Sequence, residues 1–289
     1  MNSYRQIVVH VSDSDSAGRV LSFAAALASA HGARLRALHG GAGLHGGAYL
    51  SPETAMISAR CDADLERQRL TLAHERVLQA ARTGGLDIDF ESPGGDPLEA
   101  LCARSRVADL VVVGQTASGD AQGPTRRLAS QLLVAAGCPV LFVPHGGRDT
   151  RCGTRVLVAW SATRESARAL RDALPLLQRA AAVEVLRVGV AQADTDEPLD
   201  RVIDYLRWHG ISATGSTKPV RQPPFSERML TPTVVDVSVA ELLLSHAADI
   251  DADLIVTGGY GHTRALQLVL GGVTRTLLDS MTVPALMSH

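Results

Sequence analysis

The hydrophobic and polar positions of the 289-residue chain follow one arrangement twice. Short β-branched runs, typical of parallel strands buried on both faces, alternate with longer amphipathic segments of helical spacing. In the first half we expect strands at residues 6–11, 35–39, 86–91, 110–114 and 139–143. Helices are expected between them at residues 17–31, 62–82, 96–106 and 125–136. This βαβαβαβαβ order predicts a five-stranded parallel sheet with helices on both faces and right-handed crossovers.

The same order restarts after a polar, glycine-containing linker at residues 145–153. The second set of strands is expected at residues 155–160, 183–188, 211–217, 253–256 and 282–287, with helices at 161–179, 198–209, 237–248 and 273–280. Pro175 should kink the first of these helices, and four prolines in residues 218–233 indicate a long loop.

Matching segments in the two halves indicate a duplication. Residues 108–114 read ADLVVVG and residues 252–258 read ADLIVTG, while PVL at 139–141 corresponds to PAL at 284–286. A repeat of this length is a duplicated domain, because solenoid repeats are far shorter. The sequence therefore predicts an α/β protein of two domains, at residues 1–145 and 153–289.

Composition narrows the class of protein. With 46% hydrophobic and 20% charged residues, the chain has the make-up of a soluble globular protein, and a net charge of -2 gives no reason to expect a nucleic-acid or membrane partner. Residues 1–5 lack the layout of a signal peptide, and no apolar run approaches the roughly 18 residues of a membrane span. The four cysteines form no C-x-x-C pair. We expect reduced thiols and a cytoplasmic protein.

A glycine-rich segment after the strand at 253–256 is the best candidate for chemistry. Residues 257–274 read TGGYGHTRALQLVLGGVT. Gly258, Gly259 and Gly261 would let a ligand approach main-chain amides that a Cβ atom shields. Helical spacing at residues 263–270 is interrupted at Gly271, and the helix that starts afterwards offers unpaired amides and a positive dipole end to an anion. In the alternative interpretation, these glycines only shape a tight turn.

The spacing Gly258-x2-Gly261-x9-Gly271 resembles the nucleotide loop of the universal stress protein (UspA-like) superfamily, G-x2-G-x9-G-[ST]. In that family the loop cradles the phosphates of ATP. Gly272 replaces the final Ser or Thr here, and Thr274 lies two positions late. A hydrogen bond to a charged group contributes about 1.5–3 kcal/mol, so its loss would weaken phosphate binding by roughly ten- to a hundredfold.

The resemblance covers the whole chain as a tandem pair. It implies two Rossmann-like domains of five parallel strands in the order 3-2-1-4-5, and in that family single domains usually pair through the last strand. We therefore expect the two halves to form a pseudo-dimer within one molecule. A homodimer of the tandem chain is left open.

The expected ligand is ATP or another adenine nucleotide, with Mg²⁺ as an optional companion. Ligands of open parallel sheets bind beyond the carboxyl ends of the strands, where the strand order reverses. In the second half this crevice should be lined by Ala159, Trp160, Ser161, Val188, Thr257, Gly258, Gly259, Gly261, His262, Gly271, Gly272, Val273 and Thr274. Trp160, Ser161 and Val188 are expected near the base and ribose, and the glycines near phosphate. The Asp that the family often carries after its first strand is replaced by Ser12 and Ser161.

The first half departs further from this pattern. Residues 115–123 lack the glycine spacing, which predicts a structural partner without a phosphate loop. The G-x-G-x-x-G at residues 41–46 is not followed directly by a helix, so a mobile loop is expected there and not a dinucleotide fingerprint. His10, His39 and His45 form a weak metal-site alternative.

Known catalytic motifs are absent from the sequence, including G-x-x-x-x-G-K-[ST], G-x-S-x-G and H-E-x-x-H. The favoured interpretation is a nucleotide-binding stress and signalling protein that is not an enzyme. Two alternatives remain: a structural stress protein that acts through oligomeric assembly without binding nucleotide, and a slow nucleotide hydrolase.

Overall fold

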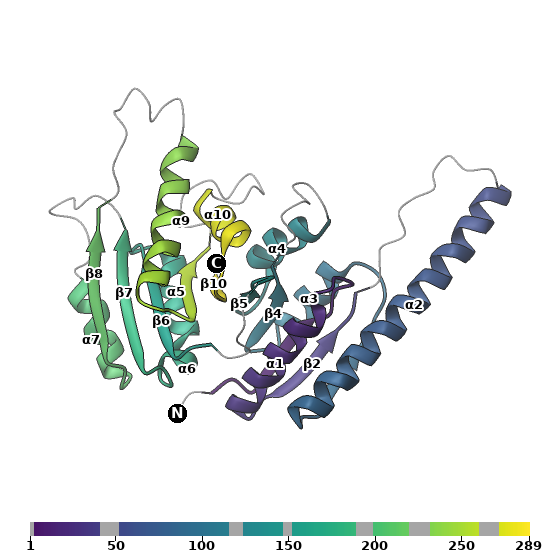
Figure 1. Ribbon diagram of the computed structural model, residues 1–289, viewed down its shortest axis with the longest axis horizontal. Helices are drawn as coiled ribbons and strands as arrows, with labels where there is room; N and C mark the ends of the chain where they lie inside the picture. Colours follow the sequence, from purple (N-terminus) through teal and green to yellow (C-terminus); the bar gives the residue numbers. More distant parts are fainter. Residues whose placement is uncertain are drawn as a thin grey trace.

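The computed structural model describes residues 3–40, 52–115, 124–146, 152–188, 199–219, 232–259 and 272–289. Its centre is a single ten-stranded sheet with helices on both faces (Figure 1). Within the described residues, none of the helices combines the length and apolar character required to span a bilayer.

Each half contributes five parallel strands in the order that the sequence predicted. The first half runs β3-β2-β1-β4-β5, with bounds β1 (Gln6–His10), β2 (Arg34–Leu38), β3 (Ile88–Glu91), β4 (Leu110–Gly114) and β5 (Val140–Val143). The second half runs β8-β7-β6-β9-β10, with bounds β6 (Arg155–Trp160), β7 (Ala182–Val188), β8 (Ala213–Lys218), β9 (Leu254–Gly258) and β10 (Ala285–Ser288). In both halves the strand order is 3-2-1-4-5 when the strands are counted along the chain, so the fold prediction is confirmed.

The helices divide between the two faces. One face carries α1 (Ala17–His31), α2 (Pro52–Gly84), α5 (Arg164–Asp172), α6 (Leu174–Leu177) and α7 (Leu199–Trp208). The other carries α3 (Pro97–Ser105), α4 (Pro124–Ala135), α9 (Pro232–Asp249) and α10 (Gly272–Ser280). Asp96 caps α3 by accepting a hydrogen bond from the Leu98 amide, as expected for Asp before a proline at the first helical position.

Three helices differ most from their predicted bounds. The helix α9 was expected at 237–248 but begins at Pro232, within the stretch expected to be a loop. The helix α2 begins ten residues earlier than the expected start at Asp62. Its amino-terminal end projects beyond the sheet (Figure 1). The helix expected at 161–179 is divided at Ala173 into α5 and α6, because Pro175 cannot continue the hydrogen-bonding of the preceding turn.

The two halves meet where β5 pairs with β10. This is an antiparallel pair in which Leu141 lies opposite Leu286 and Phe142 opposite Ala285. All four side chains are at most 1% exposed, and residues from both halves enter each of the two apolar clusters, one on either face of the sheet. A strand edge that each half would otherwise leave open is therefore buried in the chain.

Side chains at the strand ends reinforce this junction. The amide nitrogen of Gln115 donates to the main-chain oxygens of Leu278 and Asp279 at the end of α10, at 2.9 and 3.2 Å. Its side-chain oxygen accepts from the His145 amide at 2.8 Å. The Tyr4 hydroxyl donates to the Asp172 main-chain oxygen at 2.8 Å and so ties the first strand segment to α5.

In each half, the aspartate that precedes the fourth strand accepts hydrogen bonds from main-chain amides at the start of the first strand. Asp109 accepts from the amides of Arg5 and Gln6, and Asp253 accepts from those of Gly153, Thr154 and Arg155. The matching ADL segments of the two halves therefore serve the same structural purpose.

Replacing Asp253 with Ala should lower the free energy of unfolding by about 1–3 kcal/mol, because three amides lose a charged acceptor. Urea denaturation followed by circular dichroism measures this change. The exposed Asp87, at the turn before β3, provides the matched control, and Asp87→Ala should change the free energy by less than about 0.5 kcal/mol. Equal effects of the two substitutions would contradict the capping role.

Candidate functional site

The carboxyl ends of β6, β7 and β9 form the floor of the candidate site. Ala159 lies opposite Thr257 in the β6–β9 pair. Ala159, Val188 and Val273 all pack against the apolar cluster under α9 and α10 and remain partly exposed. The structure therefore brings these three predicted residues to one side of the sheet, beside the start of α10.

Trp160 lies on the opposite side. Successive side chains of a strand alternate between faces, and Trp160 packs against the cluster under α5 and α7. Its indole Nε1 atom is buried and has no hydrogen-bond partner among the described residues. Trp160 and Ala159 thus cannot both lie flat against one ligand on the same face, as the sequence analysis assumed for the whole set.

The helix α10 begins at Gly272, as the interruption in the sequence predicted. The first amides of a helix have no partner within that helix, so the start of α10 offers hydrogen-bond donors. Gly272 and Val273 are partly exposed, whereas Thr274 is only 5% exposed. Thr274 is therefore turned into the protein.

Gly258 and Gly259 are both required by packing. A Cβ atom on Gly258 would lie 2.5 Å from the Ser166 amide nitrogen, and one on Gly259 would lie 2.6 Å from the Leu133 side chain of the other half. The Gly259 amide donates to the Ser288 main-chain oxygen at 2.8 Å, so this amide is already used in the sheet. Both glycines thus have a structural reason that is independent of any ligand.

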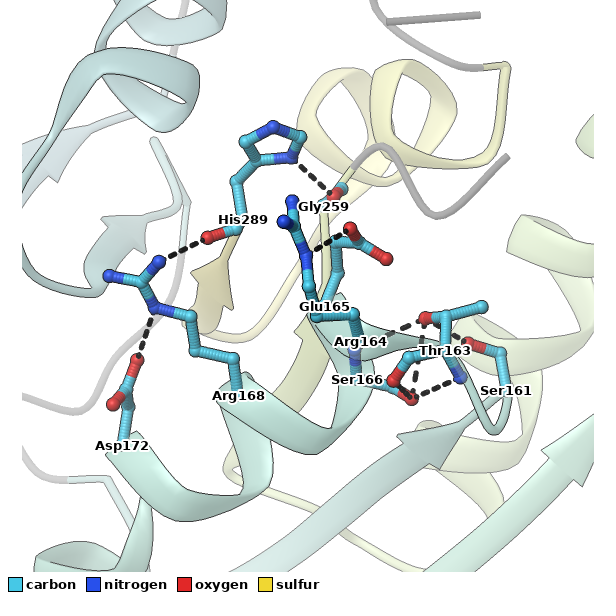
Figure 2. A network of polar contacts seen from close by, with 9 residues as sticks. All are labelled: Ser161, Thr163, Arg164, Glu165, Ser166, Arg168, Asp172, Gly259 and His289. Atoms are coloured by element: carbon cyan, nitrogen blue, oxygen red, sulfur yellow. Dashed lines mark hydrogen bonds and ion pairs between the residues drawn. The ribbon is translucent and has the colours of Figure 1, made fainter. Parts of the chain in front are cut away.

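A hydrogen-bonded loop surrounds the start of α5 beside Gly258 (Figure 2). Thr163 and Ser166 form a reciprocal capping box, and Ala162 takes a left-handed φ of 55° to allow the turn. The Ser161 hydroxyl lies 3.2 Å from that of Thr163, so it already has a partner in this loop.

The acidic group in this loop is balanced by a neighbouring cation. Burial acts to raise the pKa of Glu165, but hydrogen bonds from its own amide, from Arg164 and from Thr163 outweigh burial and lower it. Arg164 Nε lies 3.2 Å from the carboxylate.

Gly259 is hydrogen-bonded to His289. The main-chain oxygen of Gly259 accepts from His289 Nδ1 at 3.2 Å, and Arg168 donates to the main-chain oxygen of His289 (Figure 2).

Three predicted site residues, Gly261, His262 and Gly271, lie outside the described residues. The G-x-G-x-x-G segment at 41–46 and His45 also lie outside them. Among the side chains that the structure does describe, no group of three or more His, Cys, Asp or Glu is arranged to hold a metal ion.

The first half holds a polar array that motif inspection missed. His39 Nε2 lies 3.2 Å from Asp13 Oδ1, and His39 Nδ1 lies 3.5 Å from the Ser92 hydroxyl. His10 lies near this array, and its pKa is lowered to about 4 by burial and by His39, while Asp13 opposes the shift. Because these residues follow three separate strands, no local spacing could reveal them, although parallel topology brings strand ends to one edge.

A hollow of about 460 Å³ lies beside the start of α1. It is lined by Ser14, Asp15, Ser16, Arg19 and His145. The Arg19 guanidinium donates to the Gly146 main-chain oxygen at 2.6 Å, which links α1 to the segment after β5.

Comparison with known proteins gives one consistent result. The family model described as "Universal stress protein family" matches residues 3–144 and again residues 154–289. A search of curated proteins found no match to this chain.

Two solved structures that match nearly the whole chain share its fold. A universal stress protein from Archaeoglobus fulgidus DSM 4304 is 16% identical, with a TM-score of 0.72 over 98% of this chain and 95% of that chain. A putative universal stress protein from Pseudomonas aeruginosa UCBPP-PA14 is 17% identical, with a TM-score of 0.54 over 99% and 93% of the two chains. A shorter universal stress protein from Archaeoglobus fulgidus, solved in complex with dAMP, is 25% identical over 49% of this chain and 98% of its own, with a TM-score of 0.31.

Replacing Gly258 with Ala should lower the free energy of unfolding by about 1–3 kcal/mol, because the new methyl group would meet the backbone of α5 and force the helix to shift. Chemical denaturation measures the loss. Gly18→Ala is the control, since Gly18 lies in α1 with no heavy atom within 4 Å of the added carbon; it should be neutral or stabilising by up to about 1 kcal/mol. A Gly258→Ala protein as stable as wild type would contradict the packing role.

Stability should fall as the pH drops from about 6.5 towards 4. His10 is neutral when folded because its pKa is about 4, whereas the imidazole of the unfolded chain takes up the proton near its ordinary pKa of 6.5. The unfolded state thus binds more protons in this window, which favours unfolding. Compared at pH 7 and pH 4.5, the wild type should lose about 2–3 kcal/mol more than His10→Leu. Equal losses in the two proteins would refute the assignment to His10.

Proposed function

The chain belongs to the universal stress protein family, and on this premise we propose that its second half binds an adenine nucleotide, with ATP as the expected ligand. The observation that carries the proposal is the position of α10. It begins at Gly272, directly after the last glycine of the family's spacing, at the carboxyl ends of the strands. Helix starts of this kind bind phosphate through their unpaired amides and dipole.

The apolar side of the candidate site suits the base. Ala159, Val188 and Val273 provide a partly exposed apolar surface next to the start of α10. A purine placed there would keep its phosphates within reach of the α10 amides. Trp160 lies on the opposite face of the sheet and would therefore not stack on the purine.

The structure also limits which groups are available to hold phosphate. The Gly259 amide is bonded to Ser288, and the Thr274 side chain is buried. Phosphate contacts in this proposal therefore come from the amides of Gly272 and Val273, together with residues of the 260–271 segment. The pairing of Glu165 with Arg164 reduces the repulsion that this carboxylate would exert on a phosphate nearby.

Nucleotide binding is proposed for the second half alone. The residue after Gly114 is Gln115, whose side-chain nitrogen donates across the junction to Leu278 and whose side-chain oxygen accepts from the His145 amide of the same half. In the proposal the first half supports the second as an intramolecular partner. Nucleotide binding biases the conformation or the choice of partner of a cytoplasmic stress and signalling protein. Mg²⁺ would bind together with ATP, as a ligand of its phosphates.

A second candidate function is an interaction protein that binds no nucleotide. It is favoured by the packing of Gly258 and Gly259, since both glycines are explained without a ligand. The two functions differ in one measurable property. A ligand that binds only the native state raises its stability, whereas the interaction protein would show no change with nucleotide.

Titration of the wild type with a fluorescent ATP analogue should give saturable binding below millimolar concentration, with a parallel rise in melting temperature upon addition of ATP. Gly261→Val should weaken binding by at least about tenfold, because a side chain would block access to the loop amides. The control is Gly146→Val in the first half, where an added carbon meets no heavy atom within 4 Å; it should bind as the wild type does. If the wild type shows no saturable binding at millimolar ligand, the nucleotide proposal is contradicted and the second candidate, an interaction protein, is left.

A further inference from the structure

The first half contains a connected serine, histidine and aspartate at the ends of its first three strands. The Ser92 hydroxyl lies 3.5 Å from His39 Nδ1, and His39 Nε2 lies 3.2 Å from Asp13 Oδ1. Ser92 is exposed, whereas His39 is only 1% exposed. A nucleophile next to a base that a third group orients is the arrangement of covalent hydrolases, and the nucleophile–base separation is often loose when no substrate is bound.

Backbone contacts hold the histidine next to the serine. The His39 amide donates to the Glu91 main-chain oxygen at 2.9 Å, directly before Ser92. The residue after His39 is Gly40, and a Cβ atom there would lie 2.2 Å from the Cβ atom of Pro97. The loop after β2 is therefore pressed against the start of α3, and His39 has little freedom to move away from Ser92.

The aspartate is also held in place. Arg69 of α2 lies 3.4 Å from the second oxygen of Asp13, and Arg76 donates to the Ser12 main-chain oxygen at 3.2 Å. Asp13 therefore faces His39 with one oxygen and Arg69 with the other. An array whose members are fixed by neighbouring groups needs little rearrangement to react.

The fold itself does not require this array. The strand registers make Ala162, Arg187 and Thr217 the second-half counterparts of Asp13, His39 and Ser92. These residues cannot form the same array, yet the second half has the same strand order. The aspartates 109 and 253, by contrast, are present in both halves and have the same contacts, as expected for a requirement of the fold.

We propose that Ser92 and His39 are catalytic residues for the hydrolysis of small carboxylic esters, with Asp13 as the positioning residue. The Ser92 oxygen attacks the ester carbonyl carbon, and the hydroxyl proton passes to His39 Nδ1. The bond to the alcohol oxygen then breaks, and that oxygen takes the proton from His39, which leaves an acyl-serine. Water repeats the two steps, with His39 taking and returning a proton, and releases the carboxylic acid and free Ser92.

The surroundings fit a small and uncharged substrate. Gly94 and Gly95, directly after Ser92 and Pro93, have φ values of 73° and 75° and leave open space on their Cβ side. Asp96 uses its carboxylate to cap α3 through the Leu98 amide. Within the part of the chain that the structure describes, the approach to Ser92 from this side is thus open, and the proposed substrate is an ester with a short acyl group.

The test uses the full chain with p-nitrophenyl acetate and, separately, with diisopropyl fluorophosphate. Wild type should hydrolyse the ester above the buffer rate and acquire one diisopropylphosphoryl group per chain, which peptide mass spectrometry locates on Ser92. Ser92→Ala should lose both, while Ser14→Ala, on the exposed loop after β1, should retain both. Labelling at another residue, or a Ser92→Ala rate equal to that of wild type, would overturn the proposal.

The positioning role of Asp13 has a separate readout. Asp13→Asn should lower the rate of ester hydrolysis by about 10- to 100-fold with an unchanged far-UV circular dichroism spectrum, and Asp13→Glu should restore part of it. An Asp13→Asn protein with full activity, or an Asp13→Glu protein no more active than Asp13→Asn, would contradict the array. Neither result depends on nucleotide binding in the second half.

Discussion

The antiparallel pairing of β5 with β10 holds the rest of the structure in place. Each half ends in a strand whose outer edge would be open in isolation, and an open edge exposes unpaired backbone groups to other chains. Here Leu141 and Leu286 lie opposite one another at the centre of a continuous sheet. The apolar clusters on the two faces draw residues from both halves, so the two halves share one continuous core on each face.

The pairing of β5 with β10 also determines the contacts made by the residues that directly follow β4 and β9. The two positions correspond in the duplication, yet Gln115 reaches across to the end of α10, whereas Gly259 leaves room for Leu133 of α4. One half thus supplies a polar link and the other a close apolar contact. This difference between Gln115 and Gly259 agrees with the sequence, in which only the second half has the family's glycine spacing.

Much of the fold follows from sequence because its signals are local. Buried β-branched runs marked the strands, Pro175 marked the break between α5 and α6, and Gly271 marked the start of α10. The amino-terminal part of α2 was not predicted as helix, and it projects beyond the sheet, where a sequence pattern of core-facing positions is not expected. Local propensity alone decides such a segment, and pattern analysis gives it little weight.

The candidate site was less predictable because its geometry is not local. Strand alternation separates Trp160 from Ala159, and the packing of Gly258 against α5 depends on a helix that lies over ninety positions earlier in the chain. The array of Ser92, His39 and Asp13 joins three strand ends that only the parallel topology brings together. In both cases the residue types were visible in the sequence, but their neighbours were not.

Hydrogen–deuterium exchange with and without saturating ATP tests the central claim most directly, because it reports which half responds. The account predicts slower exchange for the amides at the start of α10 and the end of β9, with little change at the end of β4 in the first half. Exchange that is unaltered by ATP throughout the chain, or protection confined to the first half, would contradict it.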